Sequence, residues 1–253
     1  MPACAVFCPL VGNGQNRISG DAPKAKVTLD TRMSEVFNRD EIAAMRRSYG
    51  DAGLSENEIT QDPLIQFSKW LNDASQNALI VEANGMVLST VMGTQPMSRS
   101  VLLKDVNEAG FTFFTNYESQ KGQALENNPL VSLLFPWYAM ERQVIILGKA
   151  SKVSREESAS YFSTRPWASQ IGAWASDQSR PLINRKTLEE RFAEYAARYP
   201  EGSEVPLPPF WGGYRVTPTS IEFWQGRYSR LHDRLRYVRD GNGANWTLQR
   251  FYP

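Results

Sequence analysis

The sequence predicts a mainly β protein with flanking helices, in which the strands close into an antiparallel barrel. Several runs rich in Val, Leu, Ile and Phe follow one another closely in the middle of the chain, with short Gly, Pro and Asn segments between them. Helical patterns lie on both sides of that region. Such closely spaced strands are typical of an antiparallel barrel. The predicted strands are 86–92, 98–104, 111–115, 130–135 and 143–153.

The region before the barrel divides into a tail and two helices. Residues 1–34 show no periodicity, so they are expected to form a disordered tail, with Met33 a plausible true start and 35–253 a single domain. The segment EIAAMRRSY after Asp40 predicts a short amphipathic helix. Asp62 and Pro63 are typical of an N-cap and a first-turn proline, and they predict a helix through about residue 76. Its expected apolar side consists of Ile65, Phe67, Trp70 and Leu71.

The region after the barrel predicts two helices and closing strands. Ser154 with Glu157 three residues later is a capping-box pattern, and the helix it begins should end at Arg165-Pro166. A second helix is expected over 188–198. The stretch 200–213 is rich in Pro and Gly and predicts a surface connection. The expected closing strands are 214–216, 221–224 and 235–238.

Composition excludes several classes of protein. The 28 Lys and Arg residues nearly balance the 27 Asp and Glu residues, so no global field attracts nucleic acid or an anionic membrane. Cys4 and Cys8 alone cannot form a disulfide framework or a four-thiolate metal site, which favours a cytoplasmic setting. Apolar runs are too short to span a bilayer. Residues 1–11 hold no Lys or Arg, which argues against a signal peptide.

Arg99 and Lys104 bracket the run Ser-Val-Leu-Leu within one predicted strand. Side chains alternate along a strand, so residues 99 and 104 are expected to point to opposite faces. The two cations could then serve two different anions. Two solvated charges at strand ends are an equally simple explanation, because Lys and Arg are usually exposed.

Tyr161, Arg165 and Ser169 follow one another at intervals of four residues. Tyr161 and Arg165 share a helix face, and Ser169 falls in the first turn after Pro166, where free backbone N–H groups favour anions. An arginine fork with two hydroxyls predicts a phosphate cradle. Taken alone, a tyrosine packed on an arginine at a helix end is the simpler explanation.

The segment WQGRYSRLHDR, residues 224–234, contains the only histidine of the chain. If the segment is extended, Arg230, His232 and Arg234 line one face, which suits an anionic or electron-rich planar ligand that Trp224 could cover. A hairpin with a solvated basic side is the alternative. No second His or Cys accompanies His232, so no metal site is expected. Nucleotide-binding glycine loops, H-E-x-x-H and G-x-S-x-G are absent from the sequence.

Together with further segments, these residues resemble the pyridoxine 5′-phosphate oxidase family, the FMN enzymes of vitamin B6 metabolism. The likeness covers about residues 40–253, and the pair of WQG and RLHDR is its most specific part. The segments are RSVLLK (99–104), GFTFFTNYESQKG (110–122), RQVIILGKA (142–150), YFSTRPWASQIGAWASDQS (161–179), WGGY (211–214), EFWQGRYSRLHDR (222–234) and the terminal LQRFYP.

The resemblance implies a split β-barrel homodimer with FMN at the subunit interface. It implies oxidation of pyridoxine or pyridoxamine 5′-phosphate to pyridoxal 5′-phosphate, with oxygen as acceptor, hydrogen peroxide as product and ammonia released from the amine. The substrate would be held by Lys104, Tyr161, Arg165 and Ser169, by Arg230 and His232 at the ring, which are the candidate catalytic residues, and by Arg46, Arg47, Ser48 and Tyr49. The flavin would be held by Arg99, Ser100, Val101, Leu102, Phe114, Thr115, Gln120, Lys121, Gln143, Gln178, Ser179, Trp224 and Arg234.

One departure and one alternative accompany this interpretation. Many relatives carry Arg-Lys where this chain has Gln120-Lys121, so a cationic contact to the FMN phosphate is replaced by a neutral amide. The alternative is another split-barrel flavoprotein, either a reductase that uses deazaflavin or FMN, or a flavin-binding protein without oxidase activity. A protein that only binds flavin has no need of the second phosphate cradle, and a pyridoxal phosphate carrier would lack the flavin residues.

Overall fold

The structure is a computed structural model that describes residues 39–45, 47–241, 243 and 245–253. The chain divides into two units, Met1–Arg47 and Ser48–Pro253. The predicted tail, 1–34, lies outside the described residues. In the first unit α2 spans only Arg39–Ala44, so the helix predicted to run on to Tyr49 is shorter than expected. Its described side chains are exposed, and a helix this short gains too little from its own hydrogen bonds to extend.

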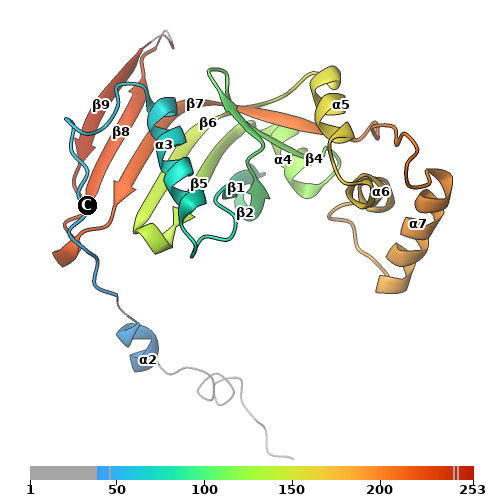
Figure 1. Ribbon diagram of the computed structural model, residues 1–253, viewed down its shortest axis with the longest axis horizontal. Helices are drawn as coiled ribbons and strands as arrows, with labels where there is room; N and C mark the ends of the chain where they lie inside the picture. Colours follow the sequence, from blue (N-terminus) through green and yellow to red (C-terminus); the bar gives the residue numbers. More distant parts are fainter. Residues whose placement is uncertain (1–38, 46, 242, 244) are drawn as a thin grey trace, which may run out of the picture. The chain divides into compact units, whose positions relative to one another are not determined.

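The second unit is built on one antiparallel sheet that curls into a barrel (Figure 1). Its main path runs β2-β1-β5-β6-β7-β4-β3, while β8 pairs with β7 and β9 with β8. The Lys104 amide donates to the Thr112 carbonyl, which joins the end of β2 to β4. The strands are β1 Gly85–Met92, β2 Gln95–Leu102, β3 Asp105–Asn107, β4 Gly110–Asn116, β5 Leu130–Trp137, β6 Arg142–Lys152, β7 Trp211–Gln225, β8 Asp233–Arg239 and β9 Trp246–Phe251.

The long strand β7 is where the barrel splits. Its first part pairs with β4 through residue 216, and its last part pairs with β8 from Ser220 onward, while β6 lies along the other edge. The two strands predicted at 214–216 and 221–224 are therefore one strand that changes partner. The register of β6 shifts between Leu147 and Gly148. A Cβ atom on Gly148 would lie 2.4 Å from the Thr217 carbonyl oxygen, so only glycine fits this close approach.

Helix α3, Pro63–Gln76, covers one side of the barrel core and begins as predicted. The Asp62 carboxylate accepts hydrogen bonds from the amides of Leu64 (2.7 Å) and Ile65 (3.3 Å). Phe67 and Trp70 are buried, and the Phe67 ring contacts rings from β4 and β5. Ile65 was expected on this side but is 53% exposed. Ile65 precedes Phe67 by two residues, so on a helix its side chain lies about 200° around the axis from that of Phe67. Ile65 therefore faces solvent.

Helices α5, α6 and α7 gather at the end of the sheet away from β8 and β9, while α4 lies nearer the middle, beside the barrel strands (Figure 1). Ser154 caps α5 by accepting from the Glu157 amide at 3.0 Å. The Glu157 carboxylate binds Arg215 at 2.5 Å. A second core forms among these helices around Phe162, Ile171 and Trp211. The helices are α4 Gln120–Asn127, which was not predicted, α5 Arg155–Ser163, α6 Trp167–Ala175, and α7 Arg185–Arg198.

Three further differences from the expected fold are local. The stretch 200–213 is not wholly a surface connection, because Val205 is buried in the helical core and β7 begins at Trp211. The strands β3 and β9 were not predicted, since β3 has three residues and β9 has no buried position. Short 3-10 turns occupy Tyr138–Met140 and Tyr228–Arg230. Among the described residues, no helix is long and apolar enough to cross a membrane.

Candidate functional site

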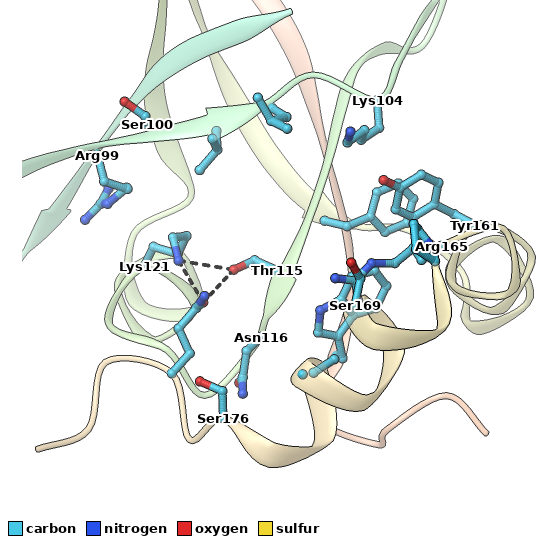
Figure 2. Close-up of a pocket in the computed structure, with 18 of the residues that line it drawn as sticks. Arg99, Ser100, Lys104, Thr115, Asn116, Lys121, Tyr161, Arg165, Ser169 and Ser176 are labelled. Carbon is cyan, nitrogen blue, oxygen red and sulfur yellow. Dashed lines mark hydrogen bonds between the residues drawn. The ribbon is translucent and has the colours of Figure 1, made fainter. Parts of the chain in front are cut away.

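A cavity of about 890 Å³ lies between the barrel strands β2 and β4 and the helices α5 and α6. Four cationic side chains line it, and no Asp or Glu is among the lining residues. Figure 2 shows these cations in two groups, one at each side of the cavity. The lining residues are Arg99, Ser100, Val101, Leu102, Lys104, Phe114, Thr115, Asn116, Lys121, Tyr161, Thr164, Arg165, Pro166, Ser169, Gly172, Ala173, Ser176, Gln178 and Trp211.

The first group consists of Arg99 and Lys121. Arg99 Nη1 donates to the carbonyl oxygens of Leu88 and Met97, both at 3.1 Å, and to the Thr90 hydroxyl at 2.8 Å. These bonds anchor the guanidinium against β1. Lys121, in the first turn of α4, is buried. Its Nζ donates to Thr115 Oγ1 (3.2 Å) and Gln178 Oε1 (2.9 Å), and the Thr115 hydroxyl also donates to Gln178 Oε1 at 3.0 Å.

The electrostatics of this group favour an anion. Burial lowers the pKa of Lys121 to about 8, and the nearby charge of Arg99 lowers it further in the same direction. Burial also lowers the pKa of Arg99. Two cations held together without a carboxylate among the lining residues are stabilised when an anion enters between them.

The second group consists of Lys104, Tyr161, Arg165 and Ser169. The Tyr161 ring stacks on Phe114, with centroids 4.0 Å apart and planes 17° apart. The Arg165 guanidinium carbon lies 4.8 Å from the ring centroid of Trp211. Arg165 Nη1 is buried and has no hydrogen-bond partner in the described part of the chain. Burial lowers the pKa of Arg165, while the Tyr161 hydroxyl acts in the opposite direction.

An unpartnered guanidinium nitrogen in a buried site is costly unless a ligand supplies the acceptor. Ser169 lies in the first turn of α6, which begins at Trp167, as the Pro166 break predicted. Helix α5 ends at Ser163, so Arg165 lies in the turn after it and not on the helix face that it was predicted to share with Tyr161. Tyr161, Arg165 and Ser169 nevertheless line one cavity, which brings together an arginine, two hydroxyls and a helix start. These groups can bind a phosphate or another compact anion.

The expectation that Arg99 and Lys104 point to opposite faces was wrong. Strand β2 ends at Leu102, so the alternation that the argument used does not reach Lys104. Both side chains line the same cavity, one in each cationic group (Figure 2). The two cations are nevertheless in separate groups, because the chain turns from β2 into β3 between them.

A second assembly of candidate residues, the ring cluster, consists of Tyr49, Trp224 and His232. The His232 ring lies 4.6 Å from the Trp224 ring and 5.3 Å from the Tyr49 ring, measured between centroids. His232 Nδ1 accepts a hydrogen bond from the Arg227 amide at 3.0 Å. Burial and then the charge of Arg230 lower the pKa of His232. The imidazole is therefore neutral at pH 7, with its proton on Nε2.

The extended arrangement expected for residues 230–234 is wrong. Residues 228–230 form a 3-10 turn, and β8 begins only at Asp233. Ser229 and Arg230 have φ values of 55° and 61°, a left-handed conformation that costs free energy in residues other than glycine. Arg234 lies on β8, where its Nε and Nη2 donate to both oxygens of the buried Glu222 at 3.0 and 3.1 Å. Arg230, His232 and Arg234 do not form one cationic row.

The cavity and the ring cluster occupy different parts of the chain. Trp211, in the cavity wall, begins β7, and Trp224, in the ring cluster, lies near its other end. At about 3.3 Å per residue, an extended strand of that length separates the two tryptophans by up to roughly 40 Å. None of the three ring-cluster residues is among the residues that line the cavity.

Several predicted residues do not line the cavity. Gln120 and Ser179 are exposed, although their neighbours Lys121 and Gln178 line it. Gln143 pairs with Trp224 across β6 and β7, so it lies beside the ring cluster. Ser48 is exposed next to Tyr49, Arg47 belongs to the first unit, and Arg46 lies outside the described residues.

The cavity also contains residues that sequence reasoning did not select. Asn116, Thr164, Ser176 and Trp211 line it. All four fall within the segments 110–122, 161–179 and 211–214 that carry the family resemblance, so the segments gave a signal but the individual residues did not. In the described part of the chain, no group of three or more His, Cys, Asp or Glu side chains could hold a metal ion.

The fold and the cavity define a split-barrel protein with a site for anionic ligands. Two family models match the chain. The pyridoxamine 5′-phosphate oxidase model matches residues 73–199, and the model for the C-terminal dimerisation region of pyridoxine 5′-phosphate oxidase matches residues 211–253.

Curated relatives agree with these matches. Proteins called pyridoxine/pyridoxamine 5′-phosphate oxidase from Nostoc punctiforme and Streptomyces avermitilis are 52% and 49% identical to this chain. The alignments cover 84% and 83% of this chain and 98% and 96% of those proteins, respectively. This chain therefore belongs to the pyridoxine/pyridoxamine 5′-phosphate oxidase family.

Solved structures support the fold. A structure of PhzG from Burkholderia lata 383, in complex with tetrahydrophenazine-1-carboxylic acid, has a TM-score of 0.74 and 30% identity, covering 81% of this chain and 99% of that one. A pyridoxamine 5′-phosphate oxidase-related, FMN binding protein from Nostoc punctiforme has a TM-score of 0.63 and 14% identity, covering 77% of this chain and 100% of that chain. The second likeness concerns the fold alone.

Proposed function

We propose that this protein is an FMN-dependent oxidase that converts pyridoxine or pyridoxamine 5′-phosphate to pyridoxal 5′-phosphate. One structural observation supports the proposal in addition to the family likeness. The cavity has two cationic groups and no carboxylate among its lining residues, so it can bind two anionic groups at once. A flavin mononucleotide and a phosphorylated pyridine each bring one phosphate.

The residues fit these two ligands. Arg165 Nη1 has no hydrogen-bond partner among the described residues, and the pKa of Lys121 is lowered. These two observations independently indicate that each side chain would bind an anion. Arg99, Lys121, Thr115 and Gln178 would hold the cofactor phosphate and ribityl chain. Lys104, Tyr161, Arg165 and Ser169 would hold the substrate phosphate. Ser100, Val101, Leu102 and Phe114 line the space between the two groups and would bind the flavin ring.

When bound, FMN would supply the redox chemistry, accepting a hydride from the 4′ carbon of the substrate and passing its electrons to oxygen to give hydrogen peroxide. The protein residues would bind and orient. Fixing both phosphates holds the reacting atoms at a set distance and replaces a bimolecular encounter with a positioned one. The apolar β2 residues and the stacked rings of Phe114 and Tyr161 exclude water from the space between the phosphates.

His232 would donate a hydrogen bond to the pyridine ring substituent. Its Nδ1 is occupied by the Arg227 amide, so Nε2–H is the atom available to a ligand, and in that state it is a donor and not a base. Arg230 is exposed beside it and would add positive charge near the 3-oxygen of the substrate.

We propose further that the active protein is a homodimer in which one chain supplies the cavity and its partner supplies the ring cluster. The placement of the two assemblies supports this, because they lie near opposite ends of β7 and no ring-cluster residue lines the cavity of the same chain. Gln143, Trp224 and Arg234 would then approach the flavin from the second chain. The match of residues 211–253 to a dimerisation region agrees with this arrangement.

Spectroscopy tests the chemistry. The purified protein is expected to show a bound flavin band, and pyridoxine 5′-phosphate should bleach it in the absence of air, with colour returning when oxygen is admitted. Unphosphorylated pyridoxine is the control, and it should require far higher concentrations because the second cationic group then has no ligand. A bound flavin that pyridoxine phosphate and pyridoxamine phosphate both fail to reduce would favour the alternative, a flavin-binding protein or reductase.

Subunit complementation tests the dimer. Arg165→Ala damages the cavity, and His232→Asn damages the ring cluster. If each site takes one assembly from each chain, a mixed dimer has one intact site and one doubly damaged site. After subunit exchange of an equal mixture, about a quarter of the wild-type sites should be restored. Activity of the mixture no higher than the mean of the two variants, with exchange verified, would contradict the shared site.

A further inference from the structure

The segment between the first unit and α3, which we call the strap, comprises residues 48–60. It contains no regular helix or strand. Leu54 and Ile59 are buried in the barrel core and fix the C-terminal half of the strap. Near its beginning, Tyr49 lies edge-on against Trp224 and His232, with centroid distances of 5.9 and 5.3 Å. The strap therefore supplies one of the three rings of the ring cluster.

Arg250, on the last strand β9, connects the strap to β8. Its Nε and Nη2 donate to the two carboxylate oxygens of Glu56 at 2.8 and 2.7 Å. The same Nη2 donates to the Leu54 carbonyl at 2.9 Å, and Nη1 donates to Asp233 Oδ1 at 2.6 Å. A single guanidinium thus binds two strap residues and one β8 residue. This forked geometry is directional in a way that a lysine contact is not.

Asp233 is the second half of this connection. It is buried, and its Oδ2 accepts from the Leu54 amide at 3.0 Å and from Arg227 Nη1 at 3.3 Å. Asp233 directly follows His232, and the Arg227 amide is the group that binds His232 Nδ1. The carboxylate therefore fixes both sides of the turn that carries His232, together with the strap that carries Tyr49.

We infer that Arg250 is a positioning residue, which through Glu56, Leu54 and Asp233 holds the strap against β8 and so keeps Tyr49 and His232 in place for the substrate ring. The inference rests on the proposed function of the ring cluster. Arg250 is not among the residues that line the cavity. It acts on the reaction only through the side chains that it holds.

The charges of this connection persist across the pH range in which an enzyme works. The hydrogen bond from Arg250 lowers the pKa of Glu56 to about 2. Burial alone would raise the pKa of Asp233, but the Leu54 amide and Arg250 lower it below its ordinary value. The pKa of Arg250 is raised, chiefly by Glu56. Protonation therefore does not release the strap at neutral pH, and substitution is the way to release it.

Arg250→Gln tests the inference in the holo protein, with amide hydrogen exchange as a readout that does not depend on activity. Exchange of the Leu54 amide should accelerate by about tenfold or more, since its acceptor Asp233 loses the Arg250 hydrogen bond that holds it in place. The limiting rate of anaerobic flavin reduction by pyridoxine phosphate, per bound flavin, should fall about 3- to 10-fold. The substrate dissociation constant should change by less than about twofold, because the cavity that binds the phosphate is untouched.

Three matched variants complete the experiment. Glu56→Gln removes the same fork from the strap side and should act in the same direction, which covers the case in which Arg250→Gln does not fold. Arg250→Lys keeps the charge and should recover part of the rate. Arg185→Gln removes an exposed ion pair with Glu189 on α7 and should change neither readout.

Two results would overturn the inference. One is unchanged exchange of the Leu54 amide in both Arg250→Gln and Glu56→Gln. The other is accelerated exchange with reduction kinetics equal to wild type, which would make the connection purely structural. If the wild-type flavin is not reduced by either phosphorylated substrate, the proposed function fails, and the exchange measurement alone then reports whether Arg250 holds the strap.

Discussion

The cavity and the ring cluster are built in different ways. The cavity residues lie on or beside regular elements, β2, β4, α5 and α6, and Arg165 keeps a buried nitrogen without a partner among the described residues. In the ring cluster, Tyr49 and His232 lie on irregular chain, the strap and the segment after a turn with two left-handed residues, and His232 Nδ1 is bound to a backbone amide. Under the proposed function, phosphate recognition would depend on preformed charge that a ligand completes, and ring recognition on a turn that distant residues hold in shape.

Among the substitutions that test this comparison of the cavity with the ring cluster, Arg165→Ala should have the largest effect. The substitution removes a buried charge-assisted fork worth roughly 1.5–3 kcal/mol, so substrate affinity should fall about 10- to 150-fold. The flavin should stay bound, because Arg99 and Lys121 are unchanged. Titration of the bound flavin spectrum with substrate measures the affinity. Loss of the flavin from Arg165→Ala would reverse the assignment of the two cationic groups.

Arg99→Ala should do the reverse, with an effect of similar or smaller size. The flavin should be lost on gel filtration, and activity should return when FMN is added in excess, as mass action requires. Because Arg99 also binds the Leu88 and Met97 carbonyls, a modest loss of stability is expected alongside. Thermal unfolding of the apo form separates that loss from the loss of flavin. An Arg99→Ala variant that keeps its flavin and binds substrate poorly contradicts the assignment.

Flavin affinity should depend on pH through Lys121. In the apo protein its pKa is lowered to about 8, and an anion beside the ammonium raises it again, so the protonated form binds flavin more tightly. Affinity should then fall about tenfold per pH unit above pH 8 until the pKa of the complex is reached, and stay nearly constant from pH 7 to 8. Flavin fluorescence titrations between pH 7 and 9 measure this. Lys121→Met is the control, and it should bind weakly with no such slope.

His232→Asn should slow the reduction of the flavin by about tenfold while changing substrate affinity less, because the variant keeps a polar group but loses the fixed Nε2–H donor. Stopped-flow reduction gives the two constants separately. In the wild type, the lowered pKa of His232 keeps the imidazole neutral at pH 7, so the reduction rate should fall only in more acidic solution, where a protonated Nδ1 can no longer accept from the Arg227 amide. An unaltered rate in the variant would remove His232 from the reaction.

Sequence patterns predicted the regular half of the molecule better than the irregular half. The five barrel strands and α3 were confirmed, because each has a strong apolar pattern and α3 has a capping residue. Tyr161, Arg165 and Ser169 line one cavity as predicted, although Arg165 lies beyond the end of α5. Strand alternation failed for Arg99 and Lys104, because the end of β2 at Leu102 depends on tertiary pairing. It failed again for residues 230–234, where a turn stabilised by the Arg227 amide and Asp233 replaces an extended chain.

The long-range relations were not accessible from local patterns. Asp233, Arg227 and Arg250 carry no mark in the sequence that ties them to Leu54 or Glu56, which lie about 180 to 190 residues earlier in the chain. The change of partner along β7 is similarly a property of the sheet and not of the strand. The family likeness selected individual site residues that periodicity could not, and it included Gln120, which the structure leaves exposed.

Gln120→Arg should have the smallest effect and sharpens the description of the flavin end. Gln120 precedes Lys121 at the first turn of α4, so an arginine there adds positive charge next to the first cationic group. At an exposed position the gain is about 0.3–1 kcal/mol, so FMN should bind roughly 2- to 5-fold tighter at low salt and the gain should shrink as salt is added. Asn127→Arg is the matched control, since it adds the same charge at the exposed far end of α4. Seven residues along a helix is roughly 10 Å, about one Debye length, so this control should barely change affinity. Equal gains from both variants would show a nonspecific effect of net charge, and no gain from Gln120→Arg would mean that its side chain does not reach the phosphate.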